Sequence, residues 1–380
     1  MQSNQLKVML IFGTRPEAIK MAPVVQQLQR DERFQVVVTV TAQHREMLDQ
    51  VLAIFHISPD YDLNIMSTAQ TLAGITTNVI NQLDEILTKE QPDIVLVHGD
   101  TTTTFAAAVS AFYHRIPIGH VEAGLRTWHK YSPFPEEMNR QMTDILSDLY
   151  FAPTTTSATN LIKQNLPLQN IFVTGNTAID ALKETVNEDY HHDVLNQIPT
   201  DHQYILLTMH RRENQGNPMR DTFQAIKHVV DQHDHLDVIY PVHLSPSVQT
   251  VAKEVFANDS RIHLIAPLDV VDFHNLAAKA LFIMTDSGGV QEEAPALGKP
   301  VLVLRNTTER PEGVAAGTLK LVGTDQHAVY QAMTHLLNDP TEFKRMSSAK
   351  NPYGDGHASE RIANSIAKYF AQQGDQMEKD

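Results

Sequence analysis

Nine short apolar runs, separated by polar stretches with helical periodicity, constrain the fold of this chain most strongly. Each run is continuously apolar rather than alternating, which is typical of strands buried on both faces of a parallel sheet. The runs cover residues 7–12, 36–41, 94–99 and 118–123 in the first half, and 204–210, 238–243, 261–267, 281–286 and 301–306 in the second. This alternation of strands and helices occurs twice and predicts an α/β protein with two doubly wound, Rossmann-like domains.

The domain boundaries are predicted from the same alternation of strands and helices. The first domain is expected over residues 1–187 and the second over 188–358, with an amphipathic helix at 359–372 that could pack back on the first domain. The polar segment 187–203 has no clear periodicity and is the best candidate for a linker. Between two such domains, the ligand is expected in the interdomain cleft.

Composition excludes several classes of function. The chain has 380 residues, a net charge of −15 and no cysteine. The negative charge argues against nucleic-acid and membrane partners, and the missing cysteines exclude disulfides and thiolate chemistry. No apolar stretch approaches the roughly 18 residues of a spanning helix, and the start lacks the basic region of a signal peptide. The cytoplasm is therefore the expected compartment.

A metal site is not expected from the histidines. The chain has 19 of them but no H-E-x-x-H spacing, and those at 191–192 and within 231–237 are interpreted as solvated loop residues.

The residues that follow each run in the first half are candidate site residues, because ligands bind at the carboxyl ends of parallel strands. Arg15 and Lys20 follow the first run, where a capping-box spacing of Thr14 and Glu17 starts a helix. They could grip an anion or be solvated charges on a capped helix. Asp100 follows the third run and is a site carboxylate, unless it or one of the threonines after it simply caps the next helix.

Glu122 stands inside an otherwise apolar run, so its carboxylate is expected to be partly buried. Such a group needs a partner, such as Arg126, or has a raised pKa suited to proton transfer. Glu136 and Glu137 open the next helix, where acids are ordinary dipole partners. The loop before them carries Trp128, which indicates either a cover over a site or a surface hydrophobic staple.

The second half supplies groups suited to phosphate. The turn at 287–289 is Ser-Gly-Gly between a strand and a short helix, an arrangement that presents backbone N–H groups to anions. His210 ends one strand, and Arg310 follows the last. Asp286 and Glu292 beside the turn are interpreted as structural or solvated acids.

Together these motifs resemble the non-hydrolysing UDP-N-acetylglucosamine 2-epimerases. The similarity extends from residue 6 to about residue 370, and the motifs are closest to those of Gram-positive members. The matching stretches are FGTRPEAIKMAP, TAQHREMLDQV, HGDTTTT, HVEAGLRT, YSPFPEEMNR, GNTAIDAL, HRREN, TDSGGVQEEAP, TTERPEG and NPYGDG.

The resemblance implies a glycosyltransferase-B-like pair of domains, a homodimer, and reversible conversion of UDP-GlcNAc to UDP-ManNAc without NAD or a catalytic metal. The product would supply cell-envelope polysaccharides, including teichoic-acid linkage units. The reaction implied is elimination of UDP to give 2-acetamidoglucal, followed by re-addition of UDP with a proton delivered to the opposite face of C2.

The same resemblance implies roles for particular residues of the site. The acid/base candidates are Asp100, Glu122 and Glu136, without an assignment of which takes and which returns the proton. The residues expected to hold or stabilise UDP are Arg15, Lys20 and His210 at the diphosphate, Ser287, Gly288, Gly289 and Arg310 at the phosphates, Glu293 at the ribose, and Phe273 at the uracil.

Relatives often carry a second, activating UDP-GlcNAc site. The residues that match it are Gln43, His44, Arg45, Glu213 and His243. Two positions depart from the pattern, with Glu46 in place of the common Gln and Ala69 in place of the common Arg. The loss of a cation and gain of an acid predicts weakened or altered activation.

Three alternatives share parts of this pattern: a hydrolysing UDP-GlcNAc 2-epimerase, a retaining nucleotide-sugar glycosyltransferase, and a non-catalytic nucleotide-sugar sensor. The clustered carboxylates of the first half favour proton chemistry over the last two. A nicotinamide-dependent epimerase is disfavoured because GTRPE stands where a glycine fingerprint would be needed.

Overall fold

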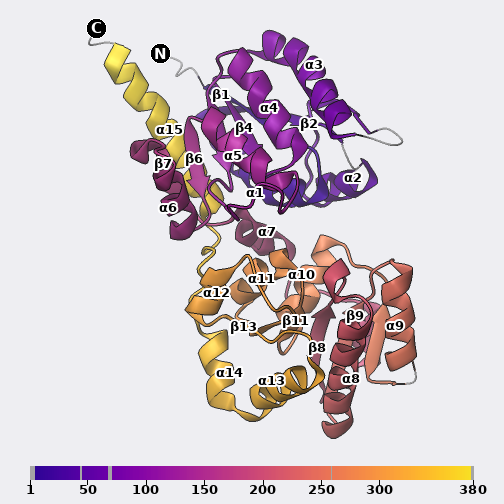
Figure 1. Ribbon diagram of the computed structural model, residues 1–380. Coiled ribbons are helices and arrows are strands. Elements are labelled where there is room, and N and C mark those ends of the chain that lie inside the picture. The colour runs from indigo at the N-terminus through magenta and orange to yellow at the C-terminus, as the bar shows by residue number, and fades with distance from the viewer. Residues whose placement is uncertain (1–4, 43–44, 67–70, 258, 378–380) are drawn as a thin grey trace. The chain divides into compact units, whose positions relative to one another are not determined.

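The chain divides into two compact units in the computed structural model, which describes residues 5–42, 45–66, 71–257 and 259–377. The first unit comprises Met1–Ala181 and Tyr353–Asp380, and the second comprises Leu182–Pro352 (Figure 1). The divisions expected from the sequence lay near residues 187 and 358, whereas the structure places them a few residues earlier in each case.

The first unit is built on a seven-stranded parallel sheet in the order β3-β2-β1-β4-β5-β6-β7. Its central strands are wholly or almost wholly apolar, which is why helices can cover both faces. The strands are β1 (Leu6–Phe12), β2 (Phe34–Val40), β3 (Tyr61–Asp62), β4 (Ile94–His98), β5 (Ile118–Val121), β6 (Leu149–Ala152) and β7 (Ile171–Val173).

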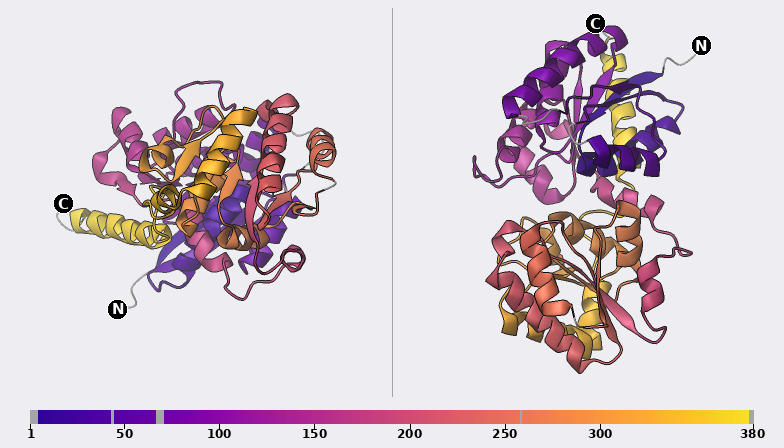
Figure 2. Two further views of the ribbon diagram at one scale, coloured as in Figure 1. Left: turned by 90° about the horizontal axis from the view of Figure 1, so that it is seen from below. Right: turned by 90° about the vertical axis from the view of Figure 1, so that its right-hand side faces the viewer.

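Helices α3, α4 and α5 lie on one face of this sheet, and α1, α2 and α15 lie on the other (Figures 1 and 2). The predicted C-terminal helix is α15, which packs on α1 within the first unit. The helices are α1 (Arg15–Gln29), α2 (Arg45–Ile54), α3 (Leu72–Glu90), α4 (Thr102–Tyr113), α5 (Glu136–Leu146), α6 (Thr155–Lys163), α7 (Thr177–Thr185) and α15 (Ala358–Met377).

The second unit has a six-stranded parallel sheet in the order β10-β9-β8-β11-β12-β13. The strands are β8 (Gln203–Thr208), β9 (Leu236–Pro241), β10 (Ile262–Ile265), β11 (Ile283–Thr285), β12 (Val301–Val303) and β13 (Leu319–Leu321). The helices are α8 (Asn217–Gln232), α9 (Pro246–Phe256), α10 (Val270–Lys279), α11 (Gly288–Glu293), α12 (Pro311–Ala316), α13 (Gln326–Asn338) and α14 (Pro340–Ser347).

The expectation that 187–203 is a linker is wrong. The segment lies inside the second unit, where Val194 is buried and Tyr190, Leu195 and Ile198 pack against a core cluster. Its short 3₁₀ turn, Asp193–Gln197, has no helical or strand periodicity, so the apolar contacts could not be recognised from the pattern.

Both sheets reverse their strand order beside their first strand, between β1 and β4 in one unit and between β8 and β11 in the other. Open α/β sheets bind ligands at the carboxyl ends of the strands at such switch points. The fold therefore brings the segments after β1 and β4 together in the first unit, and the segments after β8 and β11 together in the second. Across the described ranges, no helix is long and apolar enough to cross a membrane.

Candidate active site

Glu122, directly after β5, is the most strongly held carboxylate among the predicted site residues. Lys20 Nζ lies 2.6 Å from Glu122 Oε1, and His98 Nε2 lies 2.9 Å from Glu122 Oε2. The Asn176 amide donates to Oε1 at 3.3 Å. The Glu122 side chain is only 8% exposed, and its φ of 67° turns the backbone out of the strand direction.

Of the two sequence expectations for Glu122, a charged partner is confirmed and a raised pKa is not. Burial opposes ionisation, but Lys20 and then His98 outweigh it and hold the pKa of Glu122 well below its ordinary value. The expected partner Arg126 instead pairs with the buried Asp144. Sequence reasoning missed His98 because a histidine inside an apolar run resembles a core residue.

Asp100 does not cap the helix that follows it. Thr101 is the N-cap of α4 and its hydroxyl accepts from the Thr104 N–H. The Asp100 carboxylate pairs with Arg140 of α5, and the Asn139 amide donates to its backbone oxygen at 3.0 Å. Asp100 is thus positioned by α5, whose first residue is Glu136.

Glu137 has a structural part, as expected for one of the paired acids that open α5. Its fully buried carboxylate accepts the backbone N–H groups of Thr127 and Trp128, each at 3.0 Å. Burial raises the pKa of Glu137, but these hydrogen bonds and that of Gln141 lower it further than burial raises it. The carboxylate anchors the loop that carries Trp128, a residue that is 53% exposed.

Glu17 joins the two turns at the switch point of the first sheet. Its carboxylate accepts the backbone N–H of Thr14 at 2.7 Å and the hydroxyls of Thr101 at 2.7 Å and Thr104 at 3.0 Å. The predicted capping role of Glu17 is confirmed, but its bonds to the threonines were not foreseen. They fix the β4–α4 turn, which carries Asp100, against the start of α1, which carries Arg15.

Asp286, directly after β11, holds the segment that follows β8 at the switch point of the second sheet. Its buried carboxylate accepts the backbone N–H groups of His210 at 3.0 Å and Arg211 at 2.8 Å, and the Asn214 amide at 2.9 Å. The structural interpretation of Asp286 is therefore correct. Burial lowers the pKa of His210, although Asp286 opposes this effect.

The Ser-Gly-Gly turn begins α11, with Ser287 as the N-cap residue. Neither Gly288 nor Gly289 has a positive φ, and a Cβ added at either would meet no atom closer than 3.8 Å. The fold of the unit itself therefore does not require glycine here. Glycine at both positions keeps the N–H groups at this helix start open to a close approach by a ligand.

Glu293 ends α11, and Phe273 lies on α10. Glu293 Oε2 is 3.5 Å from Nε2 of the buried His274, whose Nδ1 is 2.7 Å from the Thr185 hydroxyl. Phe273 on α10 packs partly buried against the neighbouring core. Helix α11 is short and continues into a 3₁₀ turn, Ala294–Leu297, which contains Pro295 and is followed by Gly298.

Two arginines of the segment after β12 are held by carboxylates. Arg310 pairs with the buried Glu292, so Glu292 is also a structural acid. Arg305, which was not predicted from the sequence, bonds Glu309 at 2.6 Å and Glu213 at 2.9 Å. Burial raises the pKa of Glu309, but the Arg305 hydrogen bonds lower it to about 2.

A cavity of about 500 Å³ lies at the carboxyl ends of β8 and β11. Its lining combines predicted residues from both the substrate set and the activating set, namely His210, Ser287 and His243. The rings of His210 and His243 are 5.4 Å apart and nearly perpendicular. The remaining lining residues are Arg211, Arg212, Gln215 and Ser245, which gives the cavity a cationic wall.

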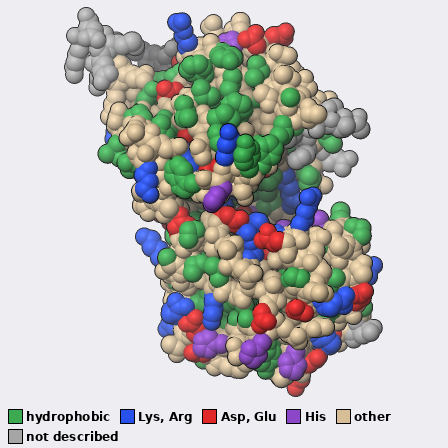
Figure 3. All heavy atoms as spheres, in the orientation of Figure 1, with side chains coloured by type: hydrophobic (Ala, Val, Ile, Leu, Met, Phe, Trp, Pro, Cys, Tyr) green, Lys and Arg blue, Asp and Glu red, His purple; other side chains and the backbone are tan. Residues whose placement is uncertain are grey.

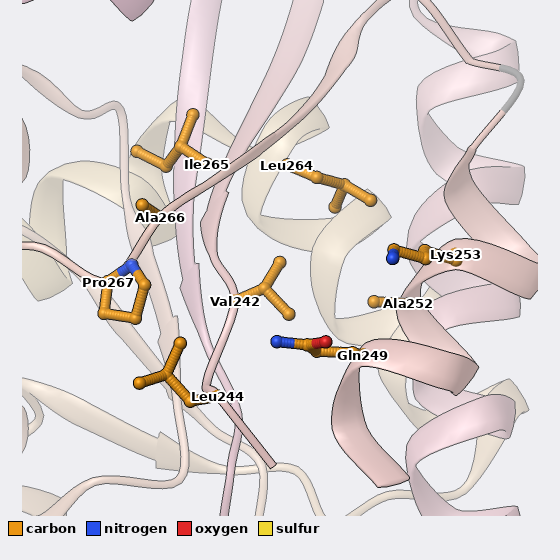
Figure 4. A pocket seen from close by; sticks show the side chains of 9 residues that line it. All are labelled: Val242, Leu244, Gln249, Ala252, Lys253, Leu264, Ile265, Ala266 and Pro267. Atoms are coloured by element: carbon orange, nitrogen blue, oxygen red, sulfur yellow. The ribbon is translucent and has the colours of Figure 1, made fainter. Parts of the chain in front are cut away.

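A second cavity of about 310 Å³ lies between α9 and the ends of β9 and β10 (Figure 4). Its lining is mostly apolar, including Val242, Leu264 and Pro267, with Gln249 and Lys253 as the polar members. None of the predicted site residues lines it, so it does not enter the candidate site.

The predicted activating set is only partly described. Arg45 pairs with Asp49 at 3.1 Å and with Asp62, and Glu213 pairs with Arg305. Gln43, His44 and Ala69, and the side chain of Glu46, lie outside the described residues.

Comparisons with known proteins identify the family of this chain. The model of the UDP-N-acetylglucosamine 2-epimerase family matches residues 26–367. A UDP-N-acetylglucosamine 2-epimerase of Bacillus subtilis is 61% identical over 97% of this chain and 96% of its own length.

Solved structures agree as well. The crystal structure of a protein of Listeria monocytogenes described as a UDP-N-acetylglucosamine 2-epimerase has a TM-score of 0.93 and 53% identity, covering 97% of this chain and 98% of that one. The UDP-GlcNAc 2-epimerase of Neisseria meningitidis, solved with UDP-GlcNAc bound, has a TM-score of 0.86 and 47% identity, covering 96% of this chain and all of that one. With matches of this extent and strand-end residues arranged as described, the chain belongs to the UDP-N-acetylglucosamine 2-epimerase family.

Proposed function

We propose that this protein interconverts UDP-GlcNAc and UDP-ManNAc by inverting C2 of the sugar. The observation that carries the proposal is the buried, ionised Glu122 at the end of β5, held by Lys20 and His98. Family membership and the UDP-GlcNAc-bound structure of the Neisseria relative support the substrate class.

The chemistry explains why an ionised carboxylate is needed. The proton at C2 of a pyranose is not adjacent to a carbonyl group, so it is not acidic enough for simple removal and return. When the C1–O bond to UDP breaks as the C2–H bond breaks, the products are UDP and 2-acetamidoglucal. Addition of a proton to the opposite face of C2, with reformation of the C1–O bond, gives the other epimer.

We assign Glu122 as the base in one direction, because a base must be ionised and the contacts of its carboxylate with Lys20 and His98 favour the ionised form. In the reverse direction, the same carboxyl group returns the proton. Asp100 and Glu136 are the candidates for the opposite face, since Arg140 of α5 holds the Asp100 carboxylate and Glu136 begins the same helix.

The second unit is proposed to hold UDP. The backbone N–H groups of Ser287, Gly288 and Gly289 would bind phosphate oxygens, and His210 would donate to the diphosphate as its charge develops. Other proposed contacts are Arg15, Lys20 and Arg310 at the diphosphate, Glu293 at the ribose hydroxyls, and Phe273 at the uracil.

Amide variants test these roles. In Asp100→Asn, Glu122→Gln and Glu136→Gln, kcat should fall about 10²- to 10⁴-fold, the usual contribution of a positioned acid or base. Calorimetry should show UDP binding nearly unchanged. Glu85→Gln, an exposed acid on α3, serves as the control and should leave both quantities intact. Near-normal turnover in Glu122→Gln would refute its assignment as base.

We also propose that the protein is a homodimer. Hydrophobic side chains gather on the face of the first unit formed by α3, α4 and α5 (Figure 3). Phe112, Tyr113 and Ile145 are 55%, 70% and 68% exposed there. Contiguous exposed apolar surface of this kind is typical of association sites. Light scattering should give twice the chain mass, and Tyr113→Glu with Ile145→Glu should give the monomer mass.

A further inference from the structure

Three side chains with metal-binding atoms lie together at the amino-terminal ends of β8 and β9. Asp201 and His202 immediately precede β8, and His235 immediately precedes β9. The ligand atoms of the three residues all lie within 4.8 Å of one another, and they form the one such group found in the part of the chain that the structure describes. Sequence spacing did not reveal it because strand pairing, and not a local motif, brings residues 202 and 235 together.

The backbone fixes the spacing of the two histidines. β8 and β9 pair in parallel with Gln203 opposite Leu236, and the Gln203 N–H donates to the His235 carbonyl at 3.0 Å. The imidazole rings consequently lie 5.2 Å apart and nearly perpendicular. The Asp201 carboxylate is 3.1 Å from His235 Nδ1.

A buried carboxylate orients His202. Asp237, only 1% exposed, lies in β9, and its two oxygens are 2.6 Å from His202 Nδ1 and 2.7 Å from His263 Nε2. A carboxylate accepts hydrogen bonds, so this contact favours the His202 tautomer that carries its proton on Nδ1 and presents Nε2 to a metal ion. Metal-binding histidines are oriented by carboxylates in the same way.

We propose that Asp201, His202 and His235 bind a divalent transition-metal ion, specifically Zn²⁺. Two imidazoles and a carboxylate form a three-ligand zinc set, with water in the fourth position. Zn–N and Zn–O bonds of about 2.0–2.2 Å require the ligand atoms to converge by roughly 1 Å. The exposed side chains of Asp201 and His235 are able to make this adjustment.

The site is separate from the proposed reaction. It lies at the amino-terminal end of the second sheet, whereas His210 and Ser287 lie at the carboxyl end. Six residues of β8 separate the two ends, which corresponds to about 20 Å at roughly 3.3 Å per residue. A bound ion would fasten the loops before β8 and β9 to each other and would stabilise this unit by binding only its folded form.

Zinc titration of the full-length protein, after treatment with a chelator, tests the proposal. Competition with a chromogenic chelator should give one Zn²⁺ per chain. Affinity should fall at least tenfold in Asp201→Asn and in His235→Ala, whose exposed side chains are not needed for folding. His327→Ala, an exposed histidine on α13, should bind like the parent protein.

A second readout distinguishes ligation from a stability effect. Co²⁺ in place of Zn²⁺ should give visible d–d absorption that is lost in His235→Ala, while the circular dichroism of that variant stays that of the parent. Failure to reach saturation at one equivalent, or unchanged affinity in both Asp201→Asn and His235→Ala, would overturn the proposal. Neither result depends on epimerase activity.

Discussion

At the scale of single residues, the pairing of Lys20 with Glu122 determines the proton chemistry proposed here. A buried carboxylate without a cation would have a raised pKa and would be a poor base at neutral pH. The 2.6 Å contact with Lys20 and the 2.9 Å contact with His98 reverse that tendency. Lys20, which the family resemblance suggests for the diphosphate, therefore also contacts the carboxylate proposed as catalytic.

Replacing Lys20 with Met should raise the pKa of Glu122, because the cation that does most to offset the burial of this carboxylate is removed. Because the pKa of Glu122 is lowered in the folded protein, its ionisation stabilises the native fold at pH values above the pKa of a free glutamate. This stabilisation is lost as the pH falls through the lowered pKa. In the variant, the acid limb of the kcat/KM profile should move to higher pH, with at least a tenfold loss at neutral pH. Lys163→Met, on the exposed side of α6, should keep the parent profile, and an unshifted limb in Lys20→Met would contradict this account.

Asp286 should matter for stability rather than for chemistry. Its carboxylate accepts two backbone N–H groups and the Asn214 amide while fully buried. Asp286→Ala leaves these donors unsatisfied, at a cost of about 1–3 kcal/mol for each buried group. Urea unfolding should show a loss of about 3 kcal/mol or more, and a loss under about 1 kcal/mol would be inconsistent with these bonds.

Residue types at strand ends could be predicted from the sequence, but their partners could not. The sequence predicts Asp100 because it follows an apolar run, and Glu122 and His210 because they stand within or at the end of one. Glu122 was paired with Arg126 on proximity in sequence, whereas the fold brings Lys20 from α1 and His98 from β4. Such partners depend on strand order, which periodicity does not specify.

At the scale of elements, the turn before α11 allows ligand binding to be tested independently of folding. Gly288→Ala and Gly289→Ala add a Cβ without a close contact and without a strained φ. Stability should be unchanged or should rise by up to about 1 kcal/mol, since alanine favours helix over glycine. The Kd for UDP should rise at least tenfold, because the methyl group stands where phosphate is proposed to bind.

Gly298→Ala should have the opposite effect, because it should lower stability and leave UDP affinity unchanged. Gly298 has a φ of +66° at the end of the following 3₁₀ turn, so alanine should destabilise the protein by about 1 kcal/mol. Its UDP affinity should be retained. Equal UDP affinity in Gly288→Ala, Gly289→Ala and the parent would remove the turn from the binding site.

The activating segment that contains Arg45 gives a further prediction. Arg45 is already paired with Asp49 and Asp62, and the sequence has Glu46 and Ala69 where relatives commonly carry Gln and Arg. Weak activation predicts a hyperbolic dependence of rate on UDP-GlcNAc. The double variant Glu46→Gln with Ala69→Arg should make the curve sigmoidal. A strongly sigmoidal curve for the parent would contradict the prediction.

Long elements could be predicted from the sequence far better than short ones. All nine apolar runs are strands, and the C-terminal helix was foreseen. Strands β3, β6, β7 and β13 are not predicted, because they have between two and four residues and, unlike the equally short β11 and β12, do not stand inside one of the nine runs. The segment 187–203 was taken for a linker because its core contacts are aperiodic.

At the scale of the whole molecule, the last segment of the chain returns to the first unit. Ile362, Ala363 and Ile366 of α15 are fully buried, and burial of an isoleucine contributes about 1.5–3 kcal/mol. Truncation after Pro352 should therefore destabilise the first unit by several kcal/mol. Hydrogen exchange should show lost protection in α1, with β8 and β9 little changed. Loss of protection confined to the second unit would contradict this division.

The first unit carries the proposed acid/base residues, and the second carries the proposed UDP-binding turn. Both assignments depend on the proposed reaction. The most direct test of the central claim is incubation of the purified protein with UDP-GlcNAc in D₂O, followed by NMR of the products. We expect UDP-ManNAc with deuterium at C2 and no requirement for an acceptor. Free ManNAc as the main product, or no incorporation of deuterium at C2, would contradict the proposed reaction.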